Sequence, residues 1–126
     1  MRALLDTAVF IFAVEAPARL SPRAFTVLKN PESIRELSVV SLTEIAIKTT
    51  LGKLNLSAEN ARQAIEDMDI HILPFAAEHA FRMFDLPRHH TDPFDRQLIA
   101  QALHEKISIV TPDEKFRRYQ GITVIW

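Results

Sequence analysis

The chain has 126 residues, 48% of them hydrophobic, and a formal net charge of −1. This length predicts one domain spanning residues 1–126, and the balanced charge gives no overall basic field that would mark a nucleic-acid-binding protein. The absence of cysteine excludes disulfides, zinc–thiolate sites and a cysteine nucleophile. The apolar N-terminal stretch 4–14 is interrupted by Asp6 and is too short to cross a bilayer, so we expect a cytoplasmic protein without a membrane partner.

Short runs of β-forming residues alternate with helical segments along the whole chain. This alternation predicts an α/β fold with a parallel sheet. In chain order, the predicted elements are strand 2–5, helices 7–15 and 22–29, strand 36–40, helices 42–51 and 58–68, strand 70–73, helices 76–84 and 93–106, strand 107–110, helix 113–119 and strand 123–125.

Several of these helices have sequence signals at their ends. Ser41 and Glu44 have the spacing of a capping box at the start of helix 42–51. Pro93 behind Asp92 is typical of a helix start. The chain has only two glycines, both at expected helix ends, so it contains no glycine-rich phosphate-binding loop.

Acidic residues follow the predicted strands or begin the helices behind them: Asp6, Glu44, Asp92, Asp95 and Asp113. Because parallel strands place their carboxyl ends at one edge of a sheet, we expect these carboxylates to gather there. Such a cluster is suited to a hard divalent cation, and Mg²⁺ in turn suggests phosphate chemistry.

Each acid also has a purely structural interpretation. Glu44 could complete the capping box or pair with Lys48 one turn later. Asp92 could cap its helix and Asp95 could interact with the helix dipole, while Asp113 lies beside a second possible capping box that begins at Thr111. Asp6 is explained less well in this way, because the following Thr7 could cap the helix instead.

Basic residues and histidines adjoin these acids in the sequence. Lys48, Arg88 and Arg96 are candidate contacts to a nucleic-acid backbone around an acidic centre. Metal binding by His89 and His90 is one interpretation, but adjacent histidines point in different directions, so we expect them to lie in a solvated loop or to contact phosphate. Ordinary surface charge is the alternative for each basic residue.

Taken together, these motifs resemble the PIN-domain nucleases, and within them the VapC-type toxins of bacterial toxin–antitoxin pairs. The resemblance covers the whole chain, and its most specific part is the Asp-Pro-Phe-Asp-Arg segment. The segments that carry it are 4–7, 41–48, 89–102 and 110–113.

The resemblance implies a five-stranded parallel sheet in the order 3-2-1-4-5, flanked by helices. It implies an Mg²⁺- or Mn²⁺-dependent endoribonuclease that cleaves tRNA or another structured RNA, forms a homodimer and is inhibited by a small cognate antitoxin. The family's acidic positions fall on Asp6, Glu44, Asp95 and Asp113, which we expect to be the catalytic residues.

Among these four, the resemblance points to Asp6 and Asp95 as the main metal ligands. Glu44 and Asp113 would bind a second metal ion, act through water or help to activate the nucleophile. Asp92 is an additional candidate ligand without an assigned role. Two alternatives stay open: a PIN-like binding module that does not cleave, and a metal-dependent nuclease that acts on DNA.

Overall fold

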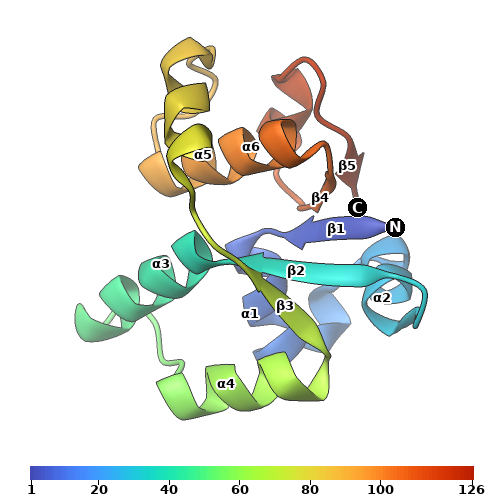
Figure 1. Ribbon diagram of the computed structural model, residues 1–126. Coiled ribbons are helices and arrows are strands. Elements are labelled where there is room, and N and C mark those ends of the chain that lie inside the picture. Colours follow the sequence, from blue (N-terminus) through green and yellow to red (C-terminus); the bar gives the residue numbers. More distant parts are fainter.

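Five strands form one parallel sheet in the order β3-β2-β1-β4-β5 in the computed structural model, which describes residues 1–126 (Figure 1). This arrangement confirms the expected α/β class, strand number and strand order. The strands are β1 (Arg2–Leu5), β2 (Ile34–Ser38), β3 (Ile70–Leu73), β4 (Ser108–Val110) and β5 (Val124–Ile125).

Six α-helices and three short 3-10 helices surround the sheet. Figure 1 shows α1, α2 and α4 on one face and α5 and α6 on the other, while α3 extends from the carboxyl end of β2. The α-helices are α1 (Thr7–Glu15), α2 (Pro22–Lys29), α3 (Val39–Thr50), α4 (Ala58–Asp67), α5 (Ala77–Arg82) and α6 (Pro93–Glu105), and the 3-10 helices are η1 (Pro17–Arg19), η2 (Met83–Asp85) and η3 (Glu114–Arg118). None of these helices combines the length and the apolar character needed to cross a membrane.

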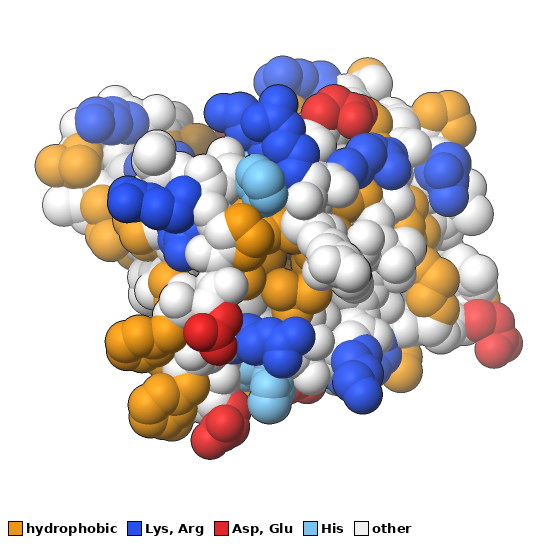
Figure 2. All heavy atoms as spheres, turned by 90° about the horizontal axis from the view of Figure 1, so that it is seen from above, with side chains coloured by type: hydrophobic (Ala, Val, Ile, Leu, Met, Phe, Trp, Pro, Cys, Tyr) orange, Lys and Arg blue, Asp and Glu red, His pale blue; other side chains and the backbone are white.

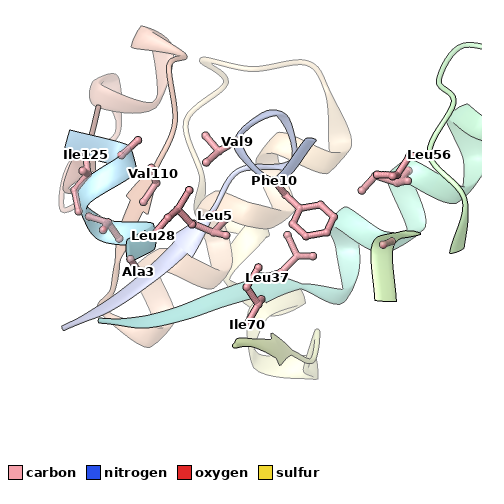
Figure 3. Close-up of a cluster of buried hydrophobic side chains, with 14 residues drawn as sticks. Ala3, Leu5, Val9, Phe10, Leu28, Leu37, Leu56, Ile70, Val110 and Ile125 are labelled. Atoms are coloured by element: carbon pink, nitrogen blue, oxygen red, sulfur yellow. The ribbon is translucent and has the colours of Figure 1, made fainter. Parts of the chain in front are cut away.

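Both faces of the sheet are buried at β1 and β4, which explains why these two strands are mostly apolar. Along β1, Ala3 and Leu5 belong to the core cluster under α1 and α2, and the intervening Leu4 belongs to the cluster under α6. The ring of Phe10, on α1, fills the centre of the first cluster and is fully buried (Figure 3). Helices therefore pack on both sides of the sheet, and its carboxyl edge stays free for a site.

The boundary between β2 and α3 differs from the predicted one. The strand ends at Ser38, and the helix begins at Val39 instead of Leu42. The β-branched pair Val39-Val40 favoured a strand in the sequence, but Ser38 caps the helix by accepting a hydrogen bond from the N–H of Val40 (3.0 Å). The predicted capping box at Ser41 is therefore wrong.

Two other helical segments are wound more tightly than predicted. The expected helix 76–84 is split into α5 and the 3-10 turn η2, and the expected helix 113–119 is the 3-10 helix η3. Asp113 caps η3 through its own carboxylate, which accepts from the N–H of Lys115 (2.9 Å). The capping box expected at Thr111 is thus replaced by an aspartate cap two residues later.

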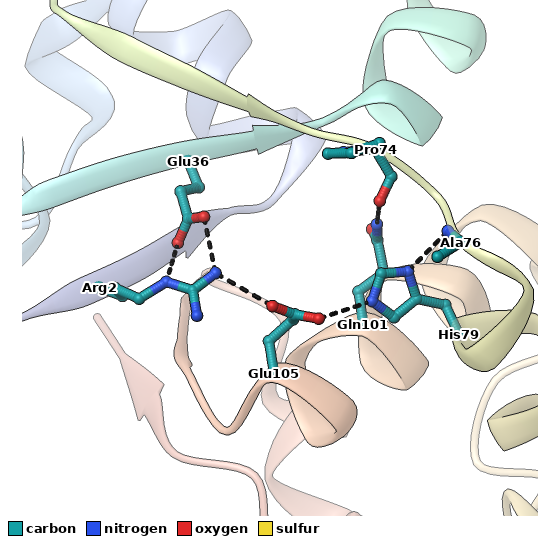
Figure 4. Close-up of polar contacts among 7 residues, drawn as sticks. All are labelled: Arg2, Glu36, Pro74, Ala76, His79, Gln101 and Glu105. Atoms are coloured by element: carbon teal, nitrogen blue, oxygen red, sulfur yellow. Dashed lines mark hydrogen bonds and ion pairs between the residues drawn. The ribbon is translucent and has the colours of Figure 1, made fainter.

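A polar network crosses the sheet on the α6 side, away from the carboxyl edge (Figure 4). The guanidinium of Arg2 donates to both carboxylate oxygens of Glu36 (2.9 and 2.8 Å) and to Glu105 (3.2 Å). Glu105 also bonds Nε2 of the buried His79 (3.0 Å), whose Nδ1 accepts from the N–H of Ala76 (2.9 Å). These bonds tie β1, β2, α5 and α6 together. The hydrogen bond from His79 lowers the pKa of Glu105, burial opposes this effect, and Arg2 adds to it.

Candidate metal centre

Five carboxylates meet at the carboxyl edge of the sheet, where the sequence predicted them to gather. They line one cavity of about 370 Å³, together with a single basic side chain, that of Lys48. The acids come from the end of β1, the second turn of α3, the start of α6 and the cap of η3: Asp6, Glu44, Asp92, Asp95 and Asp113.

Asp6 and Glu44 are the two buried carboxylates of the cavity, each with 7% of its surface exposed. The backbone N–H of Asp6 continues the sheet by donating to the carbonyl of Val110 (3.0 Å). Its side-chain Oδ2 accepts from the hydroxyl of Thr111 (2.7 Å), which comes from the neighbouring strand end. Burial raises the pKa of Asp6 to about 6, and the charges of Glu44 and Asp113 add to this, although the bond from Thr111 opposes it.

Asp95 lies in the first turn of α6, three residues after the cap. Burial raises the pKa of its carboxyl to about 7, and four neighbouring acids add to the effect, in the order Asp6, Asp92, Glu44 and Asp113. Repulsion among carboxylates of this kind is what a bound cation removes.

Asp113 has a hydrogen bond at each carboxylate oxygen. Oδ1 accepts from the N–H of Lys115 (2.9 Å), and Oδ2 accepts from Nε2 of His90 (2.9 Å). Burial acts to raise the pKa of Asp113, but the bonds and charges of His90 and Lys115 outweigh it, so the pKa is lowered. Asp113 is therefore ionised and held in place.

The prediction that His90 lies in a solvated loop is wrong. Its side chain is buried, and its ring stacks on Tyr119 and packs edge-on against Phe116. These contacts join residues that are 23 to 29 positions apart in the sequence. Nothing in the local sequence around His90 indicates them.

Glu44 forms an ion pair with Lys48 one helical turn later, which is one of its two structural interpretations. The Glu44 side chain is nearly buried, and that of Lys48 is 43% exposed at the rim of the cavity. The bond to Glu44 raises the pKa of Lys48, burial opposes this, and the charges of Glu44, Asp92 and Asp95 add to it. Lys48 therefore remains a cation next to the acids.

The other two candidate substrate contacts differ in their surroundings. The Arg96 guanidinium donates to the carbonyls of Pro87 (2.8 Å) and Leu86 (3.4 Å) and so anchors the loop before α6. Arg88, on that loop, is exposed and has no ion pair or side-chain hydrogen bond. Of the two, Arg88 has the more freely available guanidinium.

Thr111 is the residue of the site that sequence analysis missed most clearly. Its hydroxyl donates to Asp6 and accepts from the backbone N–H of Asp113 (3.1 Å), so one side chain fixes two acids relative to each other. Its position directly after a buried strand was a usable signal, but the sequence suggested only a helix cap.

The donor chemistry of the cavity fits a hard divalent cation. Carboxylate oxygens are the ligands that Mg²⁺ and Mn²⁺ prefer. A carboxylate oxygen of Asp95 and one of Asp113 lie within 4.8 Å of each other. Five acids and one lysine line the cavity, so it carries more negative charge than the lysine balances, and this repulsion adds to the burial that raises the pKa values of Asp6 and Asp95.

The metal-free protein is expected to lose stability as the pH rises from 5 to 8. Asp6 and Asp95 have pKa values of about 6 and 7 in the folded protein, above the ordinary value of 3.8. Their contribution to folding stability is therefore fully present below pH 3.8 and is lost as the pH rises through 6 to 7. We expect a decrease of about 2 kcal/mol in the free energy of unfolding, after allowance for the partial exposure of Asp95. Urea unfolding in EDTA at each pH measures this decrease, and a stability that rises over this range would contradict it.

The chain matches the family model of the PIN domain over residues 3–122. No curated protein is similar enough in sequence to match. Several solved structures share the fold at low sequence identity. VapBC2 of Rickettsia felis, bound to a DNA fragment from its promoter, has 17% identity and a TM-score of 0.73, with 98% of this chain and 97% of that chain covered.

Two further structures are similar over nearly their whole length. A toxin–antitoxin complex of Klebsiella pneumoniae has 17% identity and a TM-score of 0.63, covering 96% of this chain and 95% of that one. VapBC-5 of Mycobacterium tuberculosis, from a family of toxin–antitoxin systems, has 18% identity and a TM-score of 0.61, covering 98% and 97%. At these identities the structures establish the fold, and the family model establishes the family: the chain belongs to the PIN-domain family.

Proposed function

We propose that this protein is an Mg²⁺- or Mn²⁺-dependent endoribonuclease that acts as the toxin of a toxin–antitoxin pair. The observation that carries the proposal is the cavity at the carboxyl edge of the sheet, in which five acids face one lysine. PIN domains are nucleases, and a nuclease that uses metal ions needs a carboxylate cluster of this kind.

Asp6 and Asp95 are the main metal ligands in this proposal. Asp6 is buried and Asp95 is partly buried, and both gain most from a cation because burial and the repulsion of neighbouring acids disfavour their ionised forms. Glu44 and Asp113 would hold a second ion or orient a water molecule. Asp92 caps α6 through Oδ1, which accepts from the N–H of Phe94 (2.8 Å), and the residue also lines the cavity.

A bound Mg²⁺ or Mn²⁺ would supply an acidified water molecule and charge neutralisation at the phosphate. The chain itself supplies the orientation. Thr111 fixes the direction of the Asp6 carboxylate, and Asp113, ionised and doubly hydrogen-bonded, can orient a water molecule. Lys48, at the rim, can contact a substrate phosphate.

Positive charge on the neighbouring surface supports a nucleic-acid substrate. Figure 2 shows Lys and Arg side chains gathered on the face seen from above, over the helices on the α6 side of the sheet. The exposed basic residues of α5, the loop before α6 and η3 are Arg82, Arg88, Lys115, Arg117 and Arg118. Such side chains can position a phosphate backbone without reading its sequence. The choice of RNA rests on the resemblance to VapC-type toxins.

The binding partners that we propose for this protein follow from the proteins that share its fold. The similar structures include a toxin–antitoxin complex and two VapBC proteins, one of them bound to promoter DNA. We propose that residues 1–126 act as one PIN domain, as a homodimer in the cytoplasm, and that a small cognate antitoxin inhibits it.

Purified protein incubated with structured RNA, single-stranded DNA and duplex DNA tests the proposed activity. We expect RNA to be cut when Mg²⁺ or Mn²⁺ is present and cleavage to stop in EDTA. Asp6→Asn, purified in parallel, should be inactive and so control for contaminating ribonuclease. Cleavage of DNA alone would identify a DNA nuclease, and no cleavage of any substrate would indicate a binding module; either result would contradict the proposal.

A further inference from the structure

We propose that His90 is a positioning residue that, oriented by the hydroxyl of Tyr119, fixes the carboxylate of Asp113 at the acidic cavity. The proposal rests on the proposed function, because it gives Asp113 a role at a metal site. It assigns to His90 and Tyr119 a task that neither the sequence motifs nor the five acids indicate.

The His90 ring is held on all sides by contacts within the fold. It is 5% exposed, stacks on the Tyr119 ring at 5.6 Å and 15°, and meets the Phe116 ring edge-on at 4.8 Å and 78°. Both ring nitrogens are used: Nδ1 lies 3.0 Å from the Tyr119 hydroxyl and Nε2 lies 2.9 Å from Oδ2 of Asp113. The ring therefore has one orientation, and its second nitrogen points to the cavity.

The hydrogen-bond partners decide where the ring carries its proton. A carboxylate oxygen can only accept, so Nε2 must bear the hydrogen that it donates to Asp113. The Tyr119 hydroxyl already accepts from the backbone N–H of His90 (3.1 Å), which leaves its own proton free to be donated to Nδ1. Tyr119 thus favours the tautomer in which His90 donates to Asp113, as second-shell partners do for metal-binding histidines.

Asp113 needs such a support more than Asp6 does. It caps a short 3-10 helix, and its side chain is 35% exposed, whereas Asp6 is buried at the end of a central strand. The bond from Lys115 holds Oδ1 only, so His90 is the contact that fixes Oδ2. Because both nitrogens of His90 are engaged, the ring acts through Asp113 and is not itself a ligand.

A double-mutant cycle on Mn²⁺ affinity, measured by calorimetry, tests this role without using RNA cleavage. We expect His90→Leu to weaken binding by about 10- to 100-fold, and the His90→Leu/Asp113→Asn double variant to bind as weakly as Asp113→Asn alone. His90→Gln, whose amide can still donate to Asp113, should recover part of the loss. Equal affinities of wild type and His90→Leu, or additive losses in the double variant, would overturn the proposal.

His79→Leu is the matched control. His79 is also a buried histidine bonded to a carboxylate, but its partner Glu105 lies at the far end of α6, about 15 Å along the helix from Asp95. Loss of this bond should lower stability and leave the Mn²⁺ affinity of the acidic cavity unchanged, although it would remove any separate binding by His79, His104 and Glu105. A wild-type protein that binds no Mn²⁺ would overturn the proposed function and this inference with it, whereas an unaffected His90→Leu would overturn the inference alone.

Nitrogen-15 NMR of the histidine rings in the metal-free wild type gives a result that depends on no variant. At pH 8 we expect the His90 signal of a ring protonated at Nε2. A ring with a bare Nε2 would overturn the proposal, because it could not donate to Asp113.

Discussion

Replacing Asp95 with asparagine is expected to reduce the rate of metal-dependent RNA cleavage by at least about 100-fold. Loss of a residue that only supports a metal ligand costs about 10- to 100-fold, so loss of a main ligand should cost more. Asparagine keeps the shape of the side chain in the first turn of α6 and removes its charge. Initial rates with one RNA substrate at saturating Mg²⁺ measure the effect.

The same variant should be more stable than the wild type in the absence of metal. The carboxyl of Asp95 has a pKa of about 7, so at pH 8 its ionised form opposes folding, and asparagine removes that cost. Asp85→Asn, at an exposed acid on η2, is the matched control and should change neither rate nor stability. If Asp95→Asn cleaved RNA at the wild-type rate, Asp95 could not be a main metal ligand.

Replacing Thr111 with valine is expected to lower the cleavage rate by about 10- to 100-fold. The substitution keeps the volume of this buried side chain and removes the hydroxyl that joins Asp6 to the backbone of Asp113. Oδ2 of Asp6 then loses its hydrogen-bond donor, and the backbone N–H of Asp113 loses its acceptor. Both acids should become less ordered relative to the sheet.

Thr111→Ser separates this effect from a loss of packing. Serine keeps the hydroxyl and removes only a methyl group, so most of the activity should remain while stability falls slightly. If Thr111→Ser lost as much activity as Thr111→Val, packing would be the cause, and the proposed link between Asp6 and Asp113 would be wrong.

The order of elements could be predicted because most of the parallel strands are rich in apolar residues and each is separated from the next by helical segments, except between β4 and β5, where the segment is a 3-10 helix. The predicted helix boundaries are wrong where the local preference of the residues conflicts with the residue that caps the helix. Val39 and Val40 favour a strand, yet Ser38 starts the helix before them by accepting the N–H of Val40. Asp113 likewise replaced the cap expected at Thr111, because its own carboxylate reaches the η3 backbone.

The acids of the cavity could be predicted because the carboxyl ends of parallel strands share one edge of a sheet. Their supports could not be predicted in the same way. Thr111 meets Asp6 across 105 residues of sequence, and His90 meets Tyr119 across 29. Only the folded chain brings these partners together, and the spacing of adjacent histidines suggested an exposed loop instead.

Calorimetric titration of Mn²⁺ into the metal-free wild type and into Asp95→Asn tests the central claim most directly, since the claim is that these carboxylates form a metal site. Samples at pH 7.5, treated with chelator and then dialysed, allow the two proteins to be compared on equal terms. We expect saturable binding to the wild type and at least about a 100-fold weaker affinity in Asp95→Asn. Equal binding by both proteins, or no binding to the wild type at millimolar Mn²⁺, would contradict the proposed metal site.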